Sequence, residues 1–121
     1  MGKSLFILVN RPPYGSISPS EALRHARGAL AKGWDAVLAL AGDGVYTALP
    51  GQSPPTGEWV SLSGAMAQFM EGGTGRGVVL AEIGALAMRG ISAHDLIPGI
   101  QPVALRELAR ALARADRVLI F

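Results

Sequence analysis

The sequence predicts an α/β domain in which helices cover both faces of a mainly parallel β-sheet. Short apolar runs alternate along the chain with segments whose apolar residues have helical spacing, and this alternation is typical of βαβ units. Half of the residues are hydrophobic and the mean hydropathy is +0.33, as in a folded globular chain. The length of 121 residues suits one core, so we expect a single domain over residues 1–121.

The first part of the chain predicts two strands with a helix between them. Ser4–Val9 is a continuous apolar run, typical of a central strand that is covered on both faces. Ser18 and Glu21 predict a helix start with serine as the cap and the spacing of a capping box, and Gly33 predicts the end of that helix. Residues 35–41 form the second predicted strand.

Gly42, Asp43 and Gly44 follow the second strand directly and precede a short helical turn that stops at Pro50. Asp43 can cap this turn while the glycines permit its tight geometry. Alternatively, Asp43 can form a polar lip of a ligand crevice at the end of the strand. The sequence favours the capping role and leaves the second open.

Residues from about 59 to 71 predict a third helix, with Met66, Phe69 and Met70 as its apolar contacts. The glycine-rich segment 72–77 comes next and leads into a strand. A dinucleotide-binding fingerprint has its glycines after a strand and before a helix, which is the opposite order. We therefore interpret this segment as a helix-to-strand loop.

The last part of the chain predicts a helical turn, a helix and a strand. Ser92 predicts the cap of the turn, which ends before Pro98, and Pro102 predicts the start of a helix that runs to about Arg114. Residues 117–121 predict the final strand. Three leucines at helical spacing are expected to face inward from the last helix: Leu105, Leu108 and Leu112.

The functional question centres on residues 78–91, which read as a buried strand running into a short alanine-rich helix. The turn passes through Glu82 and Gly84, and the helix ends at Arg89. Open α/β sheets bind ligands at the carboxyl ends of their strands, and a helix start supplies unpaired N–H groups. Glu82 either stabilises the helix start or acts as a general acid, base or ligand anchor, and the sequence pairs it with no second catalytic group.

We expect the polar residues that follow the strands to meet in one crevice, because parallel strands bring their carboxyl ends to the same edge of a sheet. The candidate ligand-binding residues are Asn10, Tyr14, Gly15, Asp43, Glu82 and Arg89.

The chain contains no cysteine, so it has no thiolate nucleophile, no persulfide carrier and no disulfide. Its two imidazoles, His25 and His94, have no partner that the sequence identifies, so neither gains a catalytic role. We expect neither a protein-built metal site nor a cofactor.

The charge pattern gives no reason to expect nucleic-acid binding. The net charge is +2 and no basic block is present. Arg106, Arg110 and Arg114 recur every four residues on the last predicted helix, which is typical of a solvated helix face near Glu107. No apolar window is long enough to span a membrane or to form a signal segment, so we expect a cytoplasmic protein. The high apolar content also suggests surface that is buried against other subunits.

Several short segments, in a fixed order, carry a family resemblance. They read P-P-Y-G-S at 12–16, G-D-G-V-Y at 42–46 with L-P-G-Q at 49–52, R-G-I at 89–91 and A-D-R-V-L-I-F at 115–121. In this order the chain resembles the DsrE/DsrF family, the small sulfur-relay proteins that include the Tus components of tRNA thiolation. The D-G-V-Y and L-P-G-Q segments are most similar to the DsrF/TusC branch.

The resemblance implies a three-layer α/β/α sandwich with a mostly parallel five-stranded sheet. It also implies a homo-oligomer, either a trimer or a hexamer, or a hetero-oligomer with DsrE- and DsrH-like paralogues. In the DsrE/TusD branch a cysteine at the start of the helix before the R-G pair passes on a persulfide sulfur. That position falls on or beside Glu82 here. A carboxylate suits the same electrostatic environment at a helix start, but it cannot carry a sulfane sulfur.

Three functional hypotheses follow. The first is an oligomeric sulfur-relay protein, in sulfur oxidation or tRNA thiolation, that acts as an accessory or structural subunit without its own persulfide transfer. The second is a stand-alone protein that binds a small ligand in the crevice around Glu82. The third is an enzyme that uses Glu82 as acid or base. Because no partner group joins Glu82, the sequence favours a protein without catalytic activity but leaves the question open.

Overall fold

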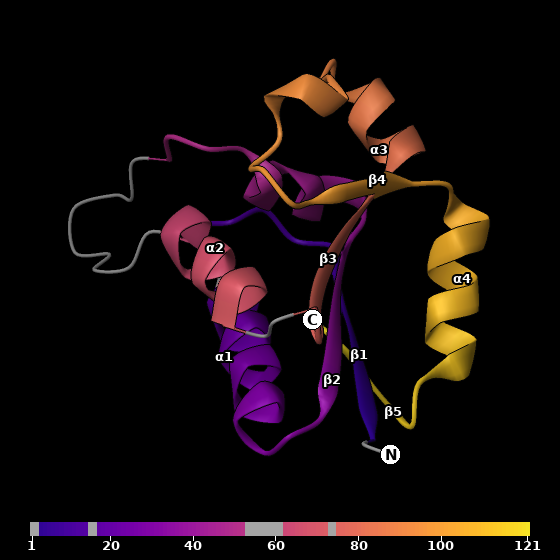
Figure 1. The fold of residues 1–121 in the computed structure, drawn as a ribbon. Coiled ribbons are helices and arrows are strands. Elements are labelled where there is room, and N and C mark those ends of the chain that lie inside the picture. The colour runs from indigo at the N-terminus through magenta and orange to yellow at the C-terminus, as the bar shows by residue number, and fades with distance from the viewer. Residues whose placement is uncertain (1–2, 15–16, 53–61, 73–74) are drawn as a thin grey trace.

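The computed structural model describes residues 3–14, 17–52, 62–72 and 75–121, which form a five-stranded sheet with helices on both faces (Figure 1). The strands lie in the order β4-β3-β2-β1-β5, and every neighbouring pair is parallel. This architecture confirms the predicted α/β sandwich. The strands are β1 (Ser4–Val9), β2 (Asp35–Leu40), β3 (Gly77–Glu82), β4 (Gln101–Val103) and β5 (Arg117–Ile120).

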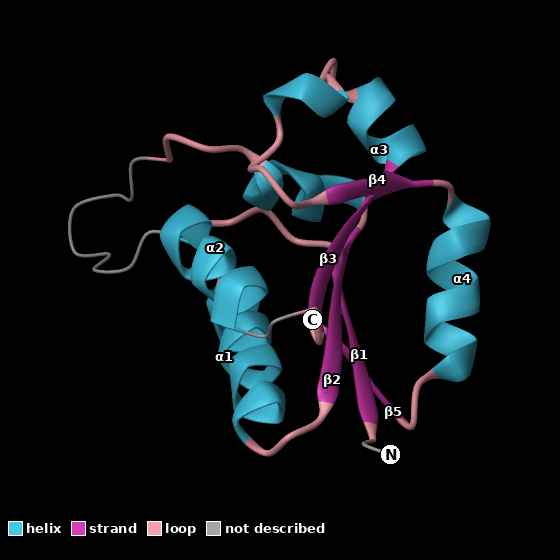
Figure 2. Ribbon diagram, viewed as in Figure 1, coloured by secondary structure: helices cyan, strands magenta, loops and turns pink. Residues whose placement is uncertain are grey.

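The helices divide into two layers and a cap at one edge of the sheet. Helices α1 (Ser18–Ala31) and α2 (Leu62–Gly72) lie on one face, and α4 (Leu105–Arg114) lies on the other (Figure 2). Helix α3 (Ile83–Met88) and the 3-10 segments η1 (Gly42–Ala48) and η2 (Ala93–Asp95) gather at the carboxyl ends of the strands (Figure 1). None of the helices in the described ranges is both long and apolar enough to cross a membrane.

The main core lies between the sheet and the α1/α2 layer. Ile7, Leu38 and Val79 stand in register on neighbouring strands, and all three are buried in this core. Successive residues of a strand point to opposite faces, so their neighbours point toward α4. There Phe6, Leu80 and Leu108 belong to a second and smaller core cluster. The apolar runs of the sequence therefore predicted central strands correctly.

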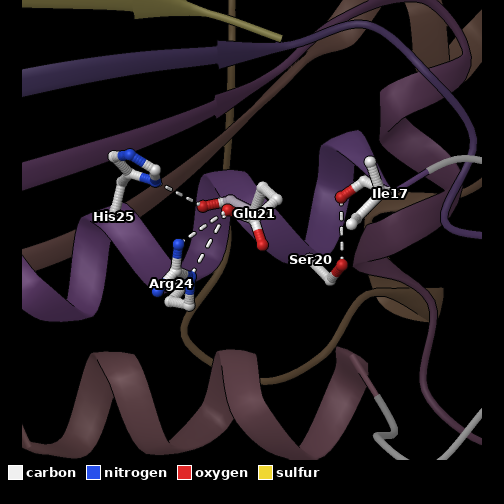
Figure 3. A network of polar contacts seen from close by, with 5 residues as sticks. All are labelled: Ile17, Ser20, Glu21, Arg24 and His25. Atoms are coloured by element: carbon white, nitrogen blue, oxygen red, sulfur yellow. Dashed lines mark hydrogen bonds and ion pairs between the residues drawn. The ribbon is translucent and has the colours of Figure 1, made fainter.

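The start of α1 differs from the prediction. The residue at the cap position is Ile17, which makes no side-chain cap hydrogen bond, and Ser18 already lies within the helix. The Ser20 hydroxyl donates to the Ile17 carbonyl at 3.0 Å, and the Glu21 carboxylate accepts from Arg24 (Figure 3). Because Ile17 rather than Ser18 holds the cap position, the predicted capping box between Ser18 and Glu21 does not form here. A capping box does form at the predicted turn at Ser92, where η2 begins.

Pro102 does not begin the last helix, as the sequence predicted. It lies in the three-residue strand β4 and is paired in register with Ala81 of β3. β4 is at the edge of the sheet, where a residue without an N–H group is tolerated because no strand of the described residues lies beyond it. A strand of three residues is too short to leave a periodic pattern in the sequence. Helix α4 begins three residues later, at Leu105.

The leucines of α4 do not all face inward. Leu108 is buried, but Leu105 is 65% exposed and Leu112 is 39% exposed. The predicted inward orientation is therefore wrong for two of the three residues. Helical spacing places these leucines on related sides of the helix, but it does not determine how much of the helix the sheet covers. The predicted third helix is described from Leu62 onward, as α2, and residues 59–61 lie outside the described residues.

Candidate functional site

Glu82 stands at the junction of β3 and α3, as the sequence predicted. It is the last residue of the strand and the cap of the helix, and its carboxylate accepts a hydrogen bond from the Ala85 N–H. Gly84 makes room for this arrangement, since a Cβ atom there would lie 2.9 Å from Oε1 of Glu82. The half-buried carboxylate therefore satisfies one of the unpaired N–H groups of the helix start.

Arg89 ends the same helix and joins it to η1. Its Nη2 and Nε atoms donate to Oδ1 of Asp43 at 2.9 and 3.1 Å, and its Nη1 donates to the Ala85 carbonyl at 3.1 Å. The guanidinium also lies 5.9 Å from the ring centroid of Tyr46, within cation–π range. The Arg89 side chain is only 21% exposed, whereas that of Asp43 is 54% exposed. In this ion pair the cation is thus partly buried and the anion is exposed to solvent.

The position of Asp43 corrects the prediction that it caps the following turn. The cap of η1 is Ala41, which makes no side-chain hydrogen bond, and the Asp43 carboxylate points to Arg89 instead. The flanking glycines do permit the tight geometry that the sequence predicted. Gly42 has a φ of 51°, and a Cβ atom at Gly44 would collide with the carbonyl oxygen of Val9. Close packing of η1 against the end of β1 therefore positions Asp43.

Asn10 and Tyr14 both follow β1 but take part in different arrangements. Asn10 is exposed and adjoins the glycine turn, since a Cβ atom at Gly42 would lie 3.7 Å from its carbonyl oxygen. The Tyr14 hydroxyl donates to Oε1 of Gln52 at 3.0 Å and accepts from the Leu62 N–H at 3.4 Å. Tyr14 therefore connects the loop after β1 to α2.

Gln52 is a residue that sequence reasoning missed as part of this edge. Its Nε2 donates to the Thr47 and Leu49 carbonyls at 3.0 and 2.8 Å, while its Oε1 accepts from Tyr14. The side chain thus holds the end of η1 against the loop after β1. The available signal was its place in the L-P-G-Q segment that carries the family resemblance.

The structure brings together some of the predicted site residues and separates others. Asp43, Glu82 and Arg89 form one cluster around α3. The Ala85 N–H donates to Glu82, the Ala85 carbonyl accepts from Arg89, and Arg89 pairs with Asp43. Tyr14 belongs to the Gln52 network, and Gly15 lies outside the described residues. No group of metal-ligating side chains large enough to hold an ion occurs in the described part of the chain. We call Asp43, Glu82 and Arg89 the α3 cluster. It is the candidate functional site at the carboxyl ends of the strands.

Apolar side chains flank the α3 cluster on the surface. Ile83 and Met88 of α3 are exposed, and so is Tyr46 of η1, which lies under the Arg89 guanidinium. Exposed apolar side chains beside a charged pair are suited to contact with another protein surface.

Known proteins resemble this chain over all or nearly all of its length. The sequence model of the DsrE/DsrF-like family matches residues 3–121. The uncharacterized protein MK0008 from Methanopyrus kandleri is 29% identical over 119 residues, which cover 95% of this chain and 91% of that protein. The ychN protein from E. coli has 32% sequence identity and a TM-score of 0.86, with all of both chains covered. MTH1491, a protein of unknown function from Methanobacterium thermoautotrophicum, shares the fold over all of both chains, with a TM-score of 0.75 and 13% identity.

Proposed function

The chain belongs to the DsrE/DsrF-like family, and on this premise we propose that it is an oligomeric subunit of cytoplasmic sulfur relay that does not itself carry a persulfide. The pathway is either sulfur oxidation or tRNA thiolation. Residues 1–121 act as one domain, and the subunit has an accessory or structural role in the assembly.

Glu82 is the observation that carries this proposal. The chain has no cysteine, and Glu82 stands at the helix start where the family resemblance places the sulfur-carrying residue. Its carboxylate is engaged in capping that helix through the Ala85 N–H. A carboxylate has no sulfur atom with which to form a persulfide bond. The site therefore offers a helix start but lacks the atom that would carry sulfur.

The sheet face that α4 partly covers, together with the exposed leucines of α4, supports assembly. We call this surface the α4 face. Val118 and Ile120 of β5 are 39% and 65% exposed and stand in register with Phe6 and Leu8 of β1. Full burial of one such side chain contributes about 1.5–3 kcal/mol. Contact with another copy, or with a DsrE- or DsrH-like paralogue, would remove this apolar surface from water.

The mass of the native complex isolated from its own cell tests the assembly. We expect a trimer or hexamer, either of this chain alone or with cysteine-bearing paralogues. Ile120→Asp on the α4 face should shift the protein toward the monomer, because burying an unpaired carboxylate is costly. Ile17→Asp is the matched control, since Ile17 is similarly exposed at the start of α1. Recovery of the wild type only as a monomer without a partner would contradict the proposal.

A sulfur-transfer assay tests the position of Glu82. The wild type should accept no sulfur from a persulfide donor, whereas Glu82→Cys should accept one sulfur atom. The thiolate attacks the outer sulfur of the donor, a new sulfur–sulfur bond forms, and the donor leaves as a thiolate. Ala109→Cys, at an exposed position of α4, is the control. Equal labelling of both variants would show that a cysteine at position 82 accepts sulfur no better than a cysteine at an exposed position of α4.

The α3 cluster favours a second candidate function, a stand-alone protein that binds a small ligand. Asp43 and Arg89 meet beside Tyr46 at the carboxyl edge of the sheet, where open α/β proteins bind ligands. Native mass spectrometry should then find a homo-oligomer with a retained small molecule and no paralogue. If Glu82→Ala leaves both ligand retention and assembly unchanged, Glu82 serves only to cap α3.

A further inference from the structure

A solvent-open surface cavity of about 350 Å³ lies beside α1 near the amino-terminal end of the sheet, at the opposite end from the α3 cluster. Leu5, near the start of β1, and Trp34, just before β2, contribute to its wall together with one side of α1. Pockets that hold small molecules are usually about 300–1,000 Å³ in volume and mostly apolar. The full lining consists of Leu5, Arg24, His25, Gly28, Ala29, Lys32 and Trp34.

The charged side chains that line this cavity are both basic. They are Arg24 and Lys32, and none of the lining residues is acidic. Lys3 adds a further cation, because its Nζ atom lies 5.7 Å from the centroid of the Trp34 ring. Glu21 is the neighbouring carboxylate, and it pairs with Arg24 at 3.0 Å (Figure 3). Lys3 and Lys32 therefore leave the rim with a net positive charge.

His25 has a defined position in the wall. Its Nδ1 atom donates to the Glu21 carbonyl at 2.9 Å, since a carbonyl oxygen can only accept (Figure 3). Its ring also packs at 5.6 Å, centroid to centroid, against the ring of Phe121. The two contacts hold the imidazole, so this part of the wall is preformed.

Gly28 keeps one wall of the cavity open. It lies inside α1, where glycine is less favourable than alanine by about 1 kcal/mol. A Cβ atom at this position would meet no other atom within 4 Å, so packing does not require the glycine. Because Gly28 lines the cavity, the absence of a side chain leaves open space at this part of its wall.

We propose that this cavity binds a small organic anion with a flat apolar body, such as an aromatic carboxylate or sulfonate. The body lies against Leu5, Ala29 and Trp34, in the space that Gly28 leaves. The acidic group points toward Lys3 and Lys32 at the rim. Charge complementarity selects an anion over a neutral molecule, and the apolar wall selects an organic anion over an inorganic one. This proposal is independent of the proposed sulfur-relay function.

Fluorescence titration with anilinonaphthalene sulfonate tests the proposal on the whole protein. Its naphthalene and anilino rings supply the apolar body, and its sulfonate supplies the charge. Phenylnaphthylamine, which has the same rings without the sulfonate, is the neutral probe. We expect saturable binding of the sulfonate at one site per chain and about tenfold weaker binding of the neutral probe, which corresponds to about 1.4 kcal/mol.

Two variants, each with a matched control, show where the probe binds. Gly28→Leu fills the cavity and should weaken sulfonate binding about tenfold or more. Gly64→Leu is the matched control, because Gly64 is also an exposed helical glycine whose added Cβ would meet nothing within 4 Å. Lys32→Gln should weaken binding about two- to fivefold, as expected for one exposed charge. Arg106→Gln on α4 is its control and should change nothing.

Three results would overturn the proposal. If Gly28→Leu binds the sulfonate as tightly as Gly64→Leu does, the probe lies elsewhere, for example on the α4 face. If the neutral probe binds as tightly as the sulfonate, the basic rim has no role. If Gly28→Leu lowers the native mass of the assembly while Gly64→Leu does not, this wall is an interface between copies rather than a ligand site.

Discussion

The two faces of the sheet are covered to different degrees. On the α1/α2 side, Ile7, Leu38 and Val79 are fully buried. On the α4 side, Leu8 and Val37 are only half-buried, and Ile120 is exposed. Both sets of residues are aliphatic and belong to the same strands or their neighbours. The comparison teaches that the two faces of one sheet can differ in how well helices cover them, and that the α4 side leaves apolar surface which the proposed assembly would bury.

The number of helices on each face explains the difference. Within the described ranges, two helices of 14 and 11 residues cover one face and a single helix of 10 residues covers the other. Five strands about 4.8 Å apart span about 19 Å, whereas a helix with its side chains is about 10 Å wide. One helix therefore covers about half of its face. Leu108 fills the covered half, and the rest remains open.

The largest effect is expected on the well-covered face, for Phe69→Ala in α2. Phe69 is fully buried in the main core, so its removal should leave a cavity and lower the free energy of unfolding by about 3–5 kcal/mol. Urea denaturation at a fixed protein concentration measures this loss. If Phe69→Ala lowers the free energy of unfolding by less than Leu108→Ala does, the α1/α2 side is not the better packed of the two faces.

A smaller effect is expected for Leu108→Ala on the α4 face. Leu108 is buried against the smaller cluster that contains Phe6 and Leu80, and we expect a loss of about 2–3 kcal/mol. The loss lies at the low end for a buried leucine because solvent and neighbouring side chains can reach the partly covered site. The same denaturation experiment applies, with Ala109→Gly as a control for helix propensity in α4.

A still smaller loss of stability is expected for a substitution at the carboxyl ends of the strands, which neither helix layer covers. Glu82→Ala removes the cap of α3 and should lower the free energy of unfolding by about 1 kcal/mol. Glu107→Ala is the control, since Glu107 makes an exposed pair with Arg110 at 3.2 Å. Similar losses for both variants would show that the Glu82 hydrogen bond contributes no more than a surface ion pair.

The smallest effect on unfolding is expected for Leu105→Gln. Leu105 is largely exposed, so the free energy of unfolding of the isolated chain should change by less than about 0.5 kcal/mol. The mass of the assembly should fall, however, because the substitution places a polar amide in the apolar α4 face. Analytical ultracentrifugation of this variant beside Leu108→Ala separates assembly from folding. A large loss of stability without a change of mass would show that Leu105 serves the fold.

Several elements were predictable because their signals are local. The strands β1 and β2 and the turn from β3 into α3 follow from apolar runs and from the glycines and charged residues that bound them. Strand β4 was not predicted from its residues, because three residues with a proline leave no periodic pattern. The predicted cap of α1 was displaced by one residue, since Ile17 rather than Ser18 holds the cap position, and the Glu21 carboxylate pairs with Arg24 instead.

The candidate site was predictable in part. The sequence placed Glu82 at a helix start after a strand, and the structure confirms that position. It did not place Asp43 against Arg89, since the two residues are 46 positions apart and their contact depends on how η1 packs on β1. The sequence also grouped Tyr14 with the α3 cluster, because all of these residues follow strands that end at the same edge of the sheet. In the structure Tyr14 is instead bonded to Gln52.

The sequence by itself determined the order of the strands and helices along most of the chain and the absence of a sulfur-carrying cysteine, since both follow from residue type and local spacing. Only the tertiary structure decided which leucines of α4 are buried, which partner Asp43 takes and where the cavity beside Trp34 opens. These features depend on the placement of distant segments against one another. Such placement is set by packing over the whole sheet, which no local pattern records.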